Sequence, residues 1–452
     1  MTRRTMAARC TVWFMAALAA ALMTGCASVG ADGGAGASGG KTPTGTAPPS
    51  AATRTGAAPT SAASSPGQAS QPIWLRSLQM TSATTGWALY YSQNPNTASA
   101  TSPLLVARTD NGGRTWTDVT PAAALPELAT VAAAQVLDPV DAEHAYLAVS
   151  GAPAEGANVE TTIELFTTAN GGHKWTESPP LRAESAVSEV SFADPEQGFL
   201  MTGGDDGAMG QDAVSLYRTA DGGEHWSLAA ATPPLTAGAT GEWGPGQIPR
   251  FCDKNGLVFP TATAGWISST CNAGLVNTLL VSGDGGSNWS DAPLPLPATI
   301  CTGNACTATG PQFTDGVGYL TVAAGGAGAA LLQTRDLGQT WEQVALPTGA
   351  GVYPRITFFN AERGILVEAE SQGSFGNTFY TTADGGQTWT PVPQGTQFTT
   401  QDAVGIDFIS TQVGFAWATG IESDPVPPAT IYETTNSGRT WHLFTPRLTA
   451  GG

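Results

Sequence analysis

The most regular chemical feature of the sequence is a set of hydroxyl, Asp or Asn, Gly and Trp residues at fixed spacing. This turn motif reads Ser or Thr, one residue, Asp or Asn, one residue, Gly, two residues, Trp, and it recurs seven times. The oxygen of Asp or Asn can accept hydrogen bonds from backbone N–H groups of a tight turn, and Gly supplies a positive φ. Trp offers a large apolar surface for burial. The motif therefore indicates a hairpin turn, with structural rather than reactive residues.

The seven turn motifs occupy residues 109–116, 168–175, 219–226, 282–289, 334–341, 382–389 and 434–441. Successive motif tryptophans are 48 to 63 residues apart, which indicates one repeated unit with loops of variable length. The structural residues expected from the motifs are Asn111, Trp116, Asn170, Trp175, Asp221, Trp226, Asp284, Trp289, Asp336, Trp341, Asp384, Trp389, Asn436 and Trp441.

Four cysteines in the body of the chain are candidates for disulfides. Cys252 and Cys271 flank a predicted hairpin that would place them opposite each other, and Cys301 and Cys306 would close a small loop. A zinc site is the alternative. The absence of a C-x-x-C pair and of a nearby histidine argues against it. We expect no metal site and no cofactor.

Residues for catalysis are scarce. The four histidines, His144, His173, His225 and His442, fall in or beside predicted hairpins, and no H-x-x-x-H pair or credible serine elbow occurs. Acidic residues are plentiful, so a pair of catalytic carboxylates stays open, because sequence spacing does not give their separation in space.

Long loops supply the candidates for ligand contact. The connection 230–252 carries Trp243 and Arg250, and the connection 203–213 carries Asp205 and Asp206. Long loops within a compact domain are often functional. The alternative is that these loops only cover the edge of a sheet.

The N-terminal segment is typical of an export signal. Residues 1–26 contain three arginines, an apolar run and Met23-Thr24-Gly25-Cys26, which resembles a bacterial lipobox. We expect lipidation of Cys26 and anchoring at the extracytoplasmic face of the cell membrane. An ordinary secretory signal is the alternative, and the sequence leaves the Sec and twin-arginine routes open. Residues 27–72 predict a disordered tether, because 40 of these 46 residues are Ala, Gly, Ser, Thr or Pro.

Charge and composition exclude other classes of protein. The formal net charge of -18 argues against nucleic-acid binding, since few cations are available to replace the counterions of phosphates. The 56 glycines and 32 prolines of the 452 residues disfavour a helical bundle.

A second periodic signal predicts the elements that position the turn motifs. An apolar strand, a polar turn and Gly-aromatic precede each motif, as in Gly198-Phe199, with Ala145-Tyr146 and Gly364-Ile365 as variants. The third repeat reads as four short strands, with the turn motif between the last two. The sequence therefore predicts an all-β fold, a seven-bladed β-propeller of four-stranded antiparallel blades over residues 73–446, followed by a tail at 447–452.

The two signals together resemble the Asp-box, or bacterial neuraminidase repeat, propellers of photosystem II assembly factors. The boxes of sortilin-type ectodomains, sialidases and xyloglucanases are more distantly similar. The resemblance implies that the motifs are scaffold and that the loops of another face would bind. A sialidase would need an F/Y-R-I-P element in the first blade, where this chain has Trp74-Leu75-Arg76-Ser77.

These observations favour a non-catalytic, lipid-anchored propeller that binds a protein or glycan partner of the cell envelope or serves as an assembly scaffold. One alternative is a glycan-active hydrolase of sialidase or xyloglucanase type, and another is a structural envelope protein. We expect no nucleic-acid partner and contact with the membrane through the lipid anchor only.

Overall fold

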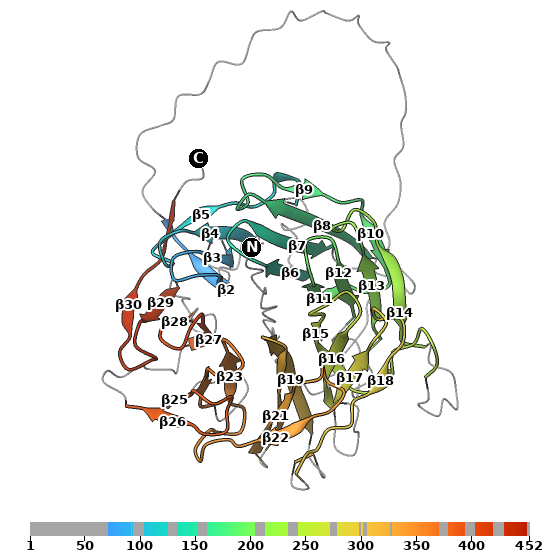
Figure 1. The fold of residues 1–452 in the computed structure, drawn as a ribbon. Coiled ribbons are helices and arrows are strands. Elements are labelled where there is room, and N and C mark those ends of the chain that lie inside the picture. The colour runs from blue at the N-terminus through green and yellow to red at the C-terminus, as the bar shows by residue number, and fades with distance from the viewer. Residues whose placement is uncertain are drawn as a thin grey trace, which may run out of the picture. The chain divides into compact units, whose positions relative to one another are not determined.

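The computed structural model describes residues 71–91, 93, 104–124, 134–151, 161–203, 213–233, 243–271, 278–297, 300–301, 305–325, 328–369, 378–393, 403–418 and 429–449. These residues form an all-β structure (Figure 1), with one 3-10 turn at Ala122–Ala124. The all-β prediction is confirmed. No helix in this part of the chain has the length and apolar character needed to cross a membrane.

The strands follow the chain in antiparallel sets of four, each a simple meander. The first three sets are β2 (Trp74–Met80), β3 (Gly86–Tyr91), β4 (Leu104–Thr109) and β5 (Thr115–Asp118); β6 (Ala134–Pro139), β7 (His144–Ser150) and β8 (Thr161–Ala169), with β9 (Thr176–Glu177) and β10 (Leu181–Ala183) both paired to β8; and β11 (Val187–Phe192), β12 (Gly198–Thr202), β13 (Ser215–Thr219) and β14 (Ser227–Ala231).

The remaining sets repeat this order. They are β15 (Asp253–Val258), β16 (Gly265–Cys271), β17 (Leu279–Ser282) and β18 (Ser290–Asp291); β19 (Cys306–Thr314), β20 (Val317–Ala324), β21 (Gly328–Thr334) and β22 (Glu342–Val344); β23 (Arg355–Phe358), β24 (Gly364–Val367), β25 (Phe379–Thr382) and β26 (Thr390–Val392); and β27 (Ala403–Phe408), β28 (Gly414–Ala418), β29 (Thr430–Thr434) and β30 (His442–Phe444).

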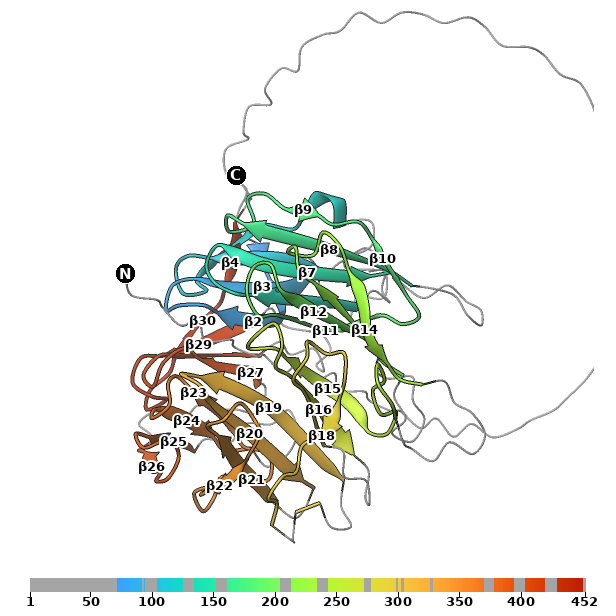
Figure 2. The ribbon, with the colours of Figure 1, turned by 45° about the vertical axis from the view of Figure 1, so that its right-hand side comes forward.

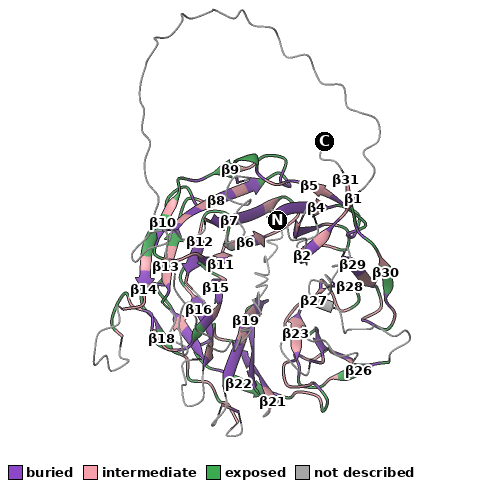
Figure 3. Cartoon of the chain, turned by 180° about the vertical axis from the view of Figure 1, so that it is seen from behind, coloured by how far each residue is buried: buried purple, intermediate pink, exposed green. Residues whose placement is uncertain are grey.

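Burial rises from the fourth strand of each set to the second. The second strands are almost wholly buried, whereas β9, β18, β22, β26 and β30 are mostly exposed (Figure 3). A strand that is buried on both faces must be largely apolar, and the sequence Val317–Ala324 (VGYLTVAA), with Thr321 among apolar and aromatic residues, meets this requirement. The core therefore lies between neighbouring sheets, at their second strands.

Consecutive sheets pack on one another through their first strands. Strand β11 contacts both β6 and β15, and β11 and β15 lie side by side in Figures 1 and 2. Strand β2 of the first set contacts β27 of the last, and the first and last sets share one apolar cluster that includes Trp87 of β3 and Phe415 of β28. The last sheet thus packs against the first and closes the series, as in a β-propeller.

The Gly-aromatic signal has a packing explanation. The glycine lies opposite the last residue of the first strand, as Gly198 lies opposite Phe192, and a Cβ on Gly198 would stand 2.3 Å from the Phe192 ring. The aromatic residue then stacks on the next set, as Phe199 does on Phe259 with ring centroids 3.4 Å apart. In the second set Pro139 lies opposite Ala145. A compact proline there leaves room for the methyl group of alanine.

Hydrogen bonds also join neighbouring sets at the next-to-last residue of the first strand. The backbone N–H of the next set is the donor and the side chain of this position is the acceptor. The acceptor and donor pairs are Asp138 with Phe192, Ser191 with Phe259 at 3.1 Å, Gln312 with Phe358 at 3.0 Å, and Asp407 with Met80 at 3.0 Å.

One pair reverses this polarity for a chemical reason. The residue that faces Gln79 is Pro139, which has no N–H to donate. The amide of Gln79 instead donates to the Pro139 carbonyl at 3.4 Å. A polar residue just before the end of the first strand therefore links two sheets.

The fourth and fifth sets share one eight-stranded sheet, so the described strands form six sheets and not seven separate ones. Strand β16 pairs with β19 through Thr270 with Thr307 and through Cys271 with Cys306. Both predicted disulfides lie at this junction and are confirmed, Cys252–Cys271 and Cys301–Cys306. Cys252–Cys271 links the two ends of the β15–β16 hairpin, and Cys301–Cys306 closes the loop that leads into β19.

The two ends of the described chain pair at the outer edge of the first sheet. Strand β31 (Arg447–Thr449) runs parallel to β5, and β1 (Gln71–Pro72) is antiparallel to β31. The predicted domain boundaries therefore need correction, because residues 447–449 were assigned to a tail and residues 71–72 to a tether. An apolar or β-branched pattern of three residues is too short to reveal a strand from sequence.

Candidate functional site

All seven turn motifs have the same hydrogen-bonded geometry. In the first, the Thr109 hydroxyl donates to Asn111 Oδ1 at 3.1 Å and accepts from the Gly113 N–H at 3.0 Å. The Thr115 N–H donates to the same Asn111 oxygen at 2.9 Å. Equivalent bonds recur in the other six motifs at Asn170, Asp221, Asp284, Asp336, Asp384 and Asn436. The motif carboxylates are thus engaged in their own turns.

The motif glycine has two roles. Its φ is positive in all seven copies, for example 96° at Gly223, as expected from sequence. It also lets the turn approach the preceding set, since a Cβ on Gly223 would stand 2.4 Å from Leu165. The residue before it also has a positive φ, and in two motifs this residue is not glycine: Leu337 has a φ of 54° and Ser437 of 65°.

The motif tryptophans anchor the turns by burial. Trp116, Trp289, Trp341 and Trp441 are buried, and Trp175, Trp226 and Trp389 pack on apolar clusters while partly exposed. The indole N–H of Trp175 donates to the Val119 carbonyl of the preceding set at 2.6 Å. These contacts place the indoles in the scaffold between sets.

The third motif differs from the others in its chemistry. His225 occupies the position that Thr or Asn holds in five other motifs, and its Nδ1 lies 2.7 Å from Asp221 Oδ2. Hydrogen bonds from the His225 backbone and ring lower the pKa of Asp221 to about 2. Ligand atoms of Asp221, Glu224 and His225 lie within 4.8 Å of one another, so the three side chains could hold a metal ion. All three are exposed and two already bond each other, so this cluster supports no metal proposal.

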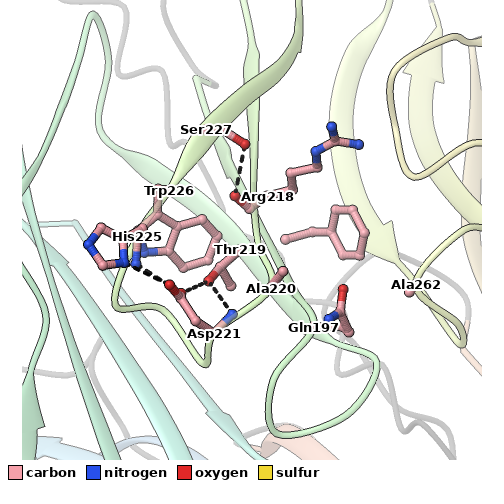
Figure 4. Close-up of a pocket in the computed structure, with 10 residues that line it drawn as sticks. Gln197, Arg218, Thr219, Ala220, Asp221, His225, Trp226, Ser227 and Ala262 are labelled. Atoms are coloured by element: carbon pink, nitrogen blue, oxygen red, sulfur yellow. Dashed lines mark hydrogen bonds and ion pairs between the residues drawn. The ribbon is translucent and has the colours of Figure 1, made fainter.

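A pocket of about 460 Å³ lies beside this motif, between the third set and the turn that precedes β16 (Figure 4). Figure 4 shows Arg218 and Gln197 on one side of Thr219 and Ala220, and Trp226, Asp221 and His225 on the other. The lining is polar with two aromatic rings: Gln197, Phe199, Arg218, Thr219, Ala220, Asp221, His225, Trp226, Ser227 and Ala262. Arg218 lies opposite Ser227 and faces the fourth set, whereas the Trp226 ring packs on Phe192 on the other face of the sheet.

Two carboxyl groups near the first strands have raised pKa values. Burial raises the pKa of Asp138 to about 7, and the N–H of Phe192 opposes this shift to a smaller extent. Burial also raises the pKa of Glu189 well above its usual value, with a further contribution from the Asp138 charge. Glu189 is 7% exposed, and Asp138 links two sheets through Phe192. Glu189 therefore lies in the interior, and the partly buried Asp138 belongs to the contact between two sheets.

Two of the four predicted ligand contacts bond within the protein. The Trp243 indole N–H donates to the Trp289 carbonyl at 3.0 Å. The Arg250 guanidinium donates to the Pro233 carbonyl at 3.2 Å and 2.7 Å. Asp205 and Asp206 lie outside the described residues, as do Cys26 and the segment before residue 71. The structure does not bring Trp243 or Arg250 into the lining of the pocket.

The pocket residues were not found from the sequence. Asp221 and Trp226 were predicted only as parts of a turn, and Arg218 and Gln197 were not singled out. An alignment of the repeats with one another could have identified Arg218, because only the first and third motifs have an arginine directly before their threonine. This signal lies in the differences between repeats and not in their shared pattern.

No protein-family model matches the chain, and no curated protein sequence matches it. Among solved structures it is similar to the GH74 enzyme of Niastella koreensis, with a TM-score of 0.48 and 16% identity over 84% of this chain and 54% of that one. It is also similar to YCF48 from Cyanidioschyzon merolae (0.44, 14%, 82% and 97%) and to an ulvan lyase of polysaccharide lyase family PL25 (0.44, 10%, 83% and 95%). The chain spans about half the length of the GH74 enzyme.

Proposed function

We propose that this chain is a binding protein of the cell envelope, held at the extracytoplasmic face of the membrane through lipidated Cys26. Its seven strand sets act as the blades of one propeller, in which the fourth and fifth blades share a sheet. The body binds a protein or glycan partner and performs no chemistry on it.

The observation that carries this proposal is the composition of the pocket beside the third turn motif. Hydrolysis of a glycosidic bond uses two carboxyl groups, one of which must hold a proton to donate. The pocket lining contains a single carboxylate, Asp221, whose pKa is lowered to about 2. Near neutral pH it is ionised and can accept hydrogen bonds but cannot donate a proton. Such a lining favours binding over hydrolysis.

Two further observations support an extracytoplasmic scaffold. Disulfides form and persist in oxidising compartments outside the cytoplasm, and the chain has two of them beside the junction of the fourth and fifth sets. The carboxyl groups of Asp138 and Asp407 and of the motif aspartates bond within the fold. These side chains stabilise the body that presents the pocket.

The test is affinity capture from an envelope extract with the exported Cys26→Ser chain carrying a C-terminal tag. We expect this chain in the soluble exported fraction, the unsubstituted chain in the membrane fraction, and a discrete protein or glycan retained on the tagged chain. A Cys10→Ser chain is the matched control and should stay with the membrane. Equal membrane association of the Cys26→Ser chain would contradict the anchor, and capture of nothing above a tag-only control would contradict the binding function.

A further inference from the structure

Three cysteines lie in a row across three neighbouring strands. Thr270 of β16 pairs with both β15 and β19, so β16 lies between these two strands. The next residue, Cys271, is opposite Cys306 of β19 and is bonded to Cys252, whose Cα atom is 4.4 Å away. Opposite residues of antiparallel strands have Cα atoms about 4.5–5.5 Å apart, and disulfides span about 4.4–6.8 Å. Cys306 is therefore placed to replace Cys252 as the partner of Cys271.

The fourth cysteine makes Cys306 accessible to a reductant. The present partner of Cys306 is Cys301, in the loop that leads into β19. Cys306 is buried in an apolar cluster, and Cys301 is the partly exposed member of the pair. A thiol from solvent therefore attacks the Cys301 sulfur, and the Cys306 sulfur departs. A thiolate is disfavoured in apolar surroundings, and the sulfur of Cys271 on the opposite strand offers it a new bond.

The backbone favours this change of partner. Cys252 and Cys301 have φ values of 69° and 67°, in the left-handed region that residues with a Cβ avoid. Cys271 and Cys306 lie in regular strands. Each present disulfide thus includes one residue in a strained conformation, whereas a Cys271–Cys306 disulfide includes none.

A cation lies beside the cysteine that would be released. Lys254 is buried, and its ammonium group donates to the carbonyls of Phe251 and Cys252 at 2.8 Å and 2.6 Å. A neighbouring positive charge stabilises a thiolate, and a more stable thiolate leaves faster. Cys252 is therefore chemically suited to depart from Cys271.

We infer that the four cysteines form a thiol–disulfide exchange site that reacts with a dithiol. One thiol of the dithiol forms a mixed disulfide with Cys301 and releases Cys306 as a thiolate. Cys306 attacks the Cys271 sulfur, the bond from Cys271 to Cys252 breaks, and Cys252 leaves with the electron pair and takes up a proton. The second thiol of the dithiol then displaces Cys301, which is also protonated.

The electrons and protons of this sequence balance. Two electrons and two protons pass from the dithiol to the protein, and the dithiol ends as a disulfide. The protein ends with one disulfide, Cys271–Cys306, and with thiols at Cys252 and Cys301. The middle step, from Cys306 to Cys271, is redox-neutral and takes place within the protein.

The exchange changes which parts of the fold are joined. The present disulfides close a hairpin and a short loop, whereas Cys271–Cys306 links β16 to β19 and so the fourth set to the fifth. Cys252 ends the connection that carries Trp243 and Arg250, and its release detaches this connection from β16. The site goes beyond the proposed binding function, because it makes this part of the protein respond to reductants around it.

The sharpest test uses one substitution and no reductant. In the exported Cys26→Ser chain, Cys301→Ser leaves Cys306 as a free thiol opposite the Cys252–Cys271 disulfide. The chain is quenched in acid, labelled with a maleimide and analysed by peptide mass spectrometry. We expect label on Cys252 to exceed label on Cys306 by about fivefold or more, the ratio expected when one left-handed residue is relaxed.

Cys306→Ser is the matched control. It removes the same disulfide and the same number of sulfur atoms, but it leaves the thiol on Cys301, which is not opposite Cys271. Its label should therefore stay on Cys301, and the Cys252–Cys271 disulfide should stay intact. Thermal unfolding of both serine variants shows whether they fold.

A second measurement keeps all four cysteines and so does not depend on the variants. Limiting dithiothreitol is added to the Cys26→Ser chain, and the molecules with one remaining disulfide are analysed in the same way. They should contain Cys271–Cys306, with label on Cys252 and Cys301.

Three results would overturn the exchange site. They are label that stays on Cys306 in the Cys301→Ser chain, one-disulfide molecules that keep Cys252–Cys271, and reduction that occurs only in urea. Exchange and partner binding are tested separately, because a chain that captures its envelope partner can still fail these measurements.

Discussion

Asp407 and Met80 are 327 residues apart in sequence, yet the Asp407 carboxylate accepts the backbone N–H of Met80 at 3.0 Å. This bond joins the first strand of the last set to the first strand of the first set. It belongs to the same series as Ser191 with Phe259 and Gln312 with Phe358. The contact that closes the succession of sheets therefore uses the same chemistry as the contacts within it.

Removal of the Asp407 carboxylate should destabilise the closure. A hydrogen bond to a charged group contributes about 1.5–3 kcal/mol, so Asp407→Ala should lower the free energy of unfolding by about 2 kcal/mol. Asp407→Asn keeps an acceptor oxygen and should lose less than half of that. Urea unfolding of the exported chain measures both losses. Equal losses in the two variants would show that this hydrogen bond does not account for the free energy of unfolding lost at residue 407.

Asp138 should make the protein less stable as pH rises. Its pKa of about 7 in the folded chain lies above the ordinary value of 3.8, so the folded state binds more protons than the unfolded state between these pH values. Stability should therefore be highest near pH 4 on account of this group, and fall by at most about 1.4 kcal/mol per pH unit until pH 7.

The matching variant is Asp138→Asn, which still accepts from the Phe192 N–H but cannot ionise. Between pH 5 and pH 8 its urea midpoint should fall less than that of the unsubstituted chain. Glu189 shifts in the same direction, so Asp138→Asn with Glu189→Gln should flatten the profile further. An equal fall in the variants and the unsubstituted chain would show that these carboxyls ionise as freely in the folded protein as in the unfolded one.

The fifth turn motif should be improved by glycine. Leu337 has a φ of 54° and its side chain is 44% exposed, so it gains little from burial. A left-handed conformation costs a residue with a Cβ about 1–2 kcal/mol, part of which glycine loses again to chain entropy. Leu337→Gly should stabilise the protein by about 0.5–1 kcal/mol in thermal or urea unfolding.

The adjacent glycine provides the opposite control. Gly338 has a φ of 78°, and a Cβ there would stand 2.7 Å from the Trp266 indole nitrogen. Gly338→Ala should therefore destabilise the chain by about 2 kcal/mol or more. A loss of stability in Leu337→Gly as well would mean that the contacts of the Leu337 side chain stabilise the fold by more than its left-handed conformation costs.

The two disulfides should contribute unequally. Cys252 and Cys271 are 19 residues apart and Cys301 and Cys306 only five, and the entropy of the unfolded chain falls more when a longer loop is closed. Replacing Cys252 and Cys271 by serine should cost about 3 kcal/mol, and replacing the other pair about 2 kcal/mol. Urea unfolding without reductant measures both, and a larger loss for the shorter loop would contradict the loop-entropy explanation.

Much of the fold could be predicted from the sequence because it is encoded by repetition. The turn motif fixes a hairpin through its own hydrogen bonds, as Thr109, Asn111 and Gly113 show, so it needs no distant partner to be recognised. The pairing of Cys252 with Cys271 also followed from local hairpin geometry. Local chemistry that recurs in sequence is visible without a structure.

The features that were missed depend on contacts between repeats. The pairing of β16 with β19, the added strand β31 and the bond from Met80 to Asp407 all join segments whose sequences do not signal one another. Trp243 and Arg250 were chosen by loop length, but their side chains donate hydrogen bonds to the backbone carbonyls of Trp289 and Pro233. Arg218 lines a pocket that forms between the third set and a turn of the fourth, and no motif search detects such a contact between sets.

The most direct measurement of the central claim follows the partner after capture. The tagged Cys26→Ser chain is incubated with envelope glycans, and bound and free material is analysed by mass spectrometry and by an assay for new chain ends. Binding without chemistry predicts that glycan is retained with unchanged mass and that no new ends form over hours. Shortened glycans or new reducing ends that increase with protein concentration, and that disappear with a heat-unfolded sample, would contradict it.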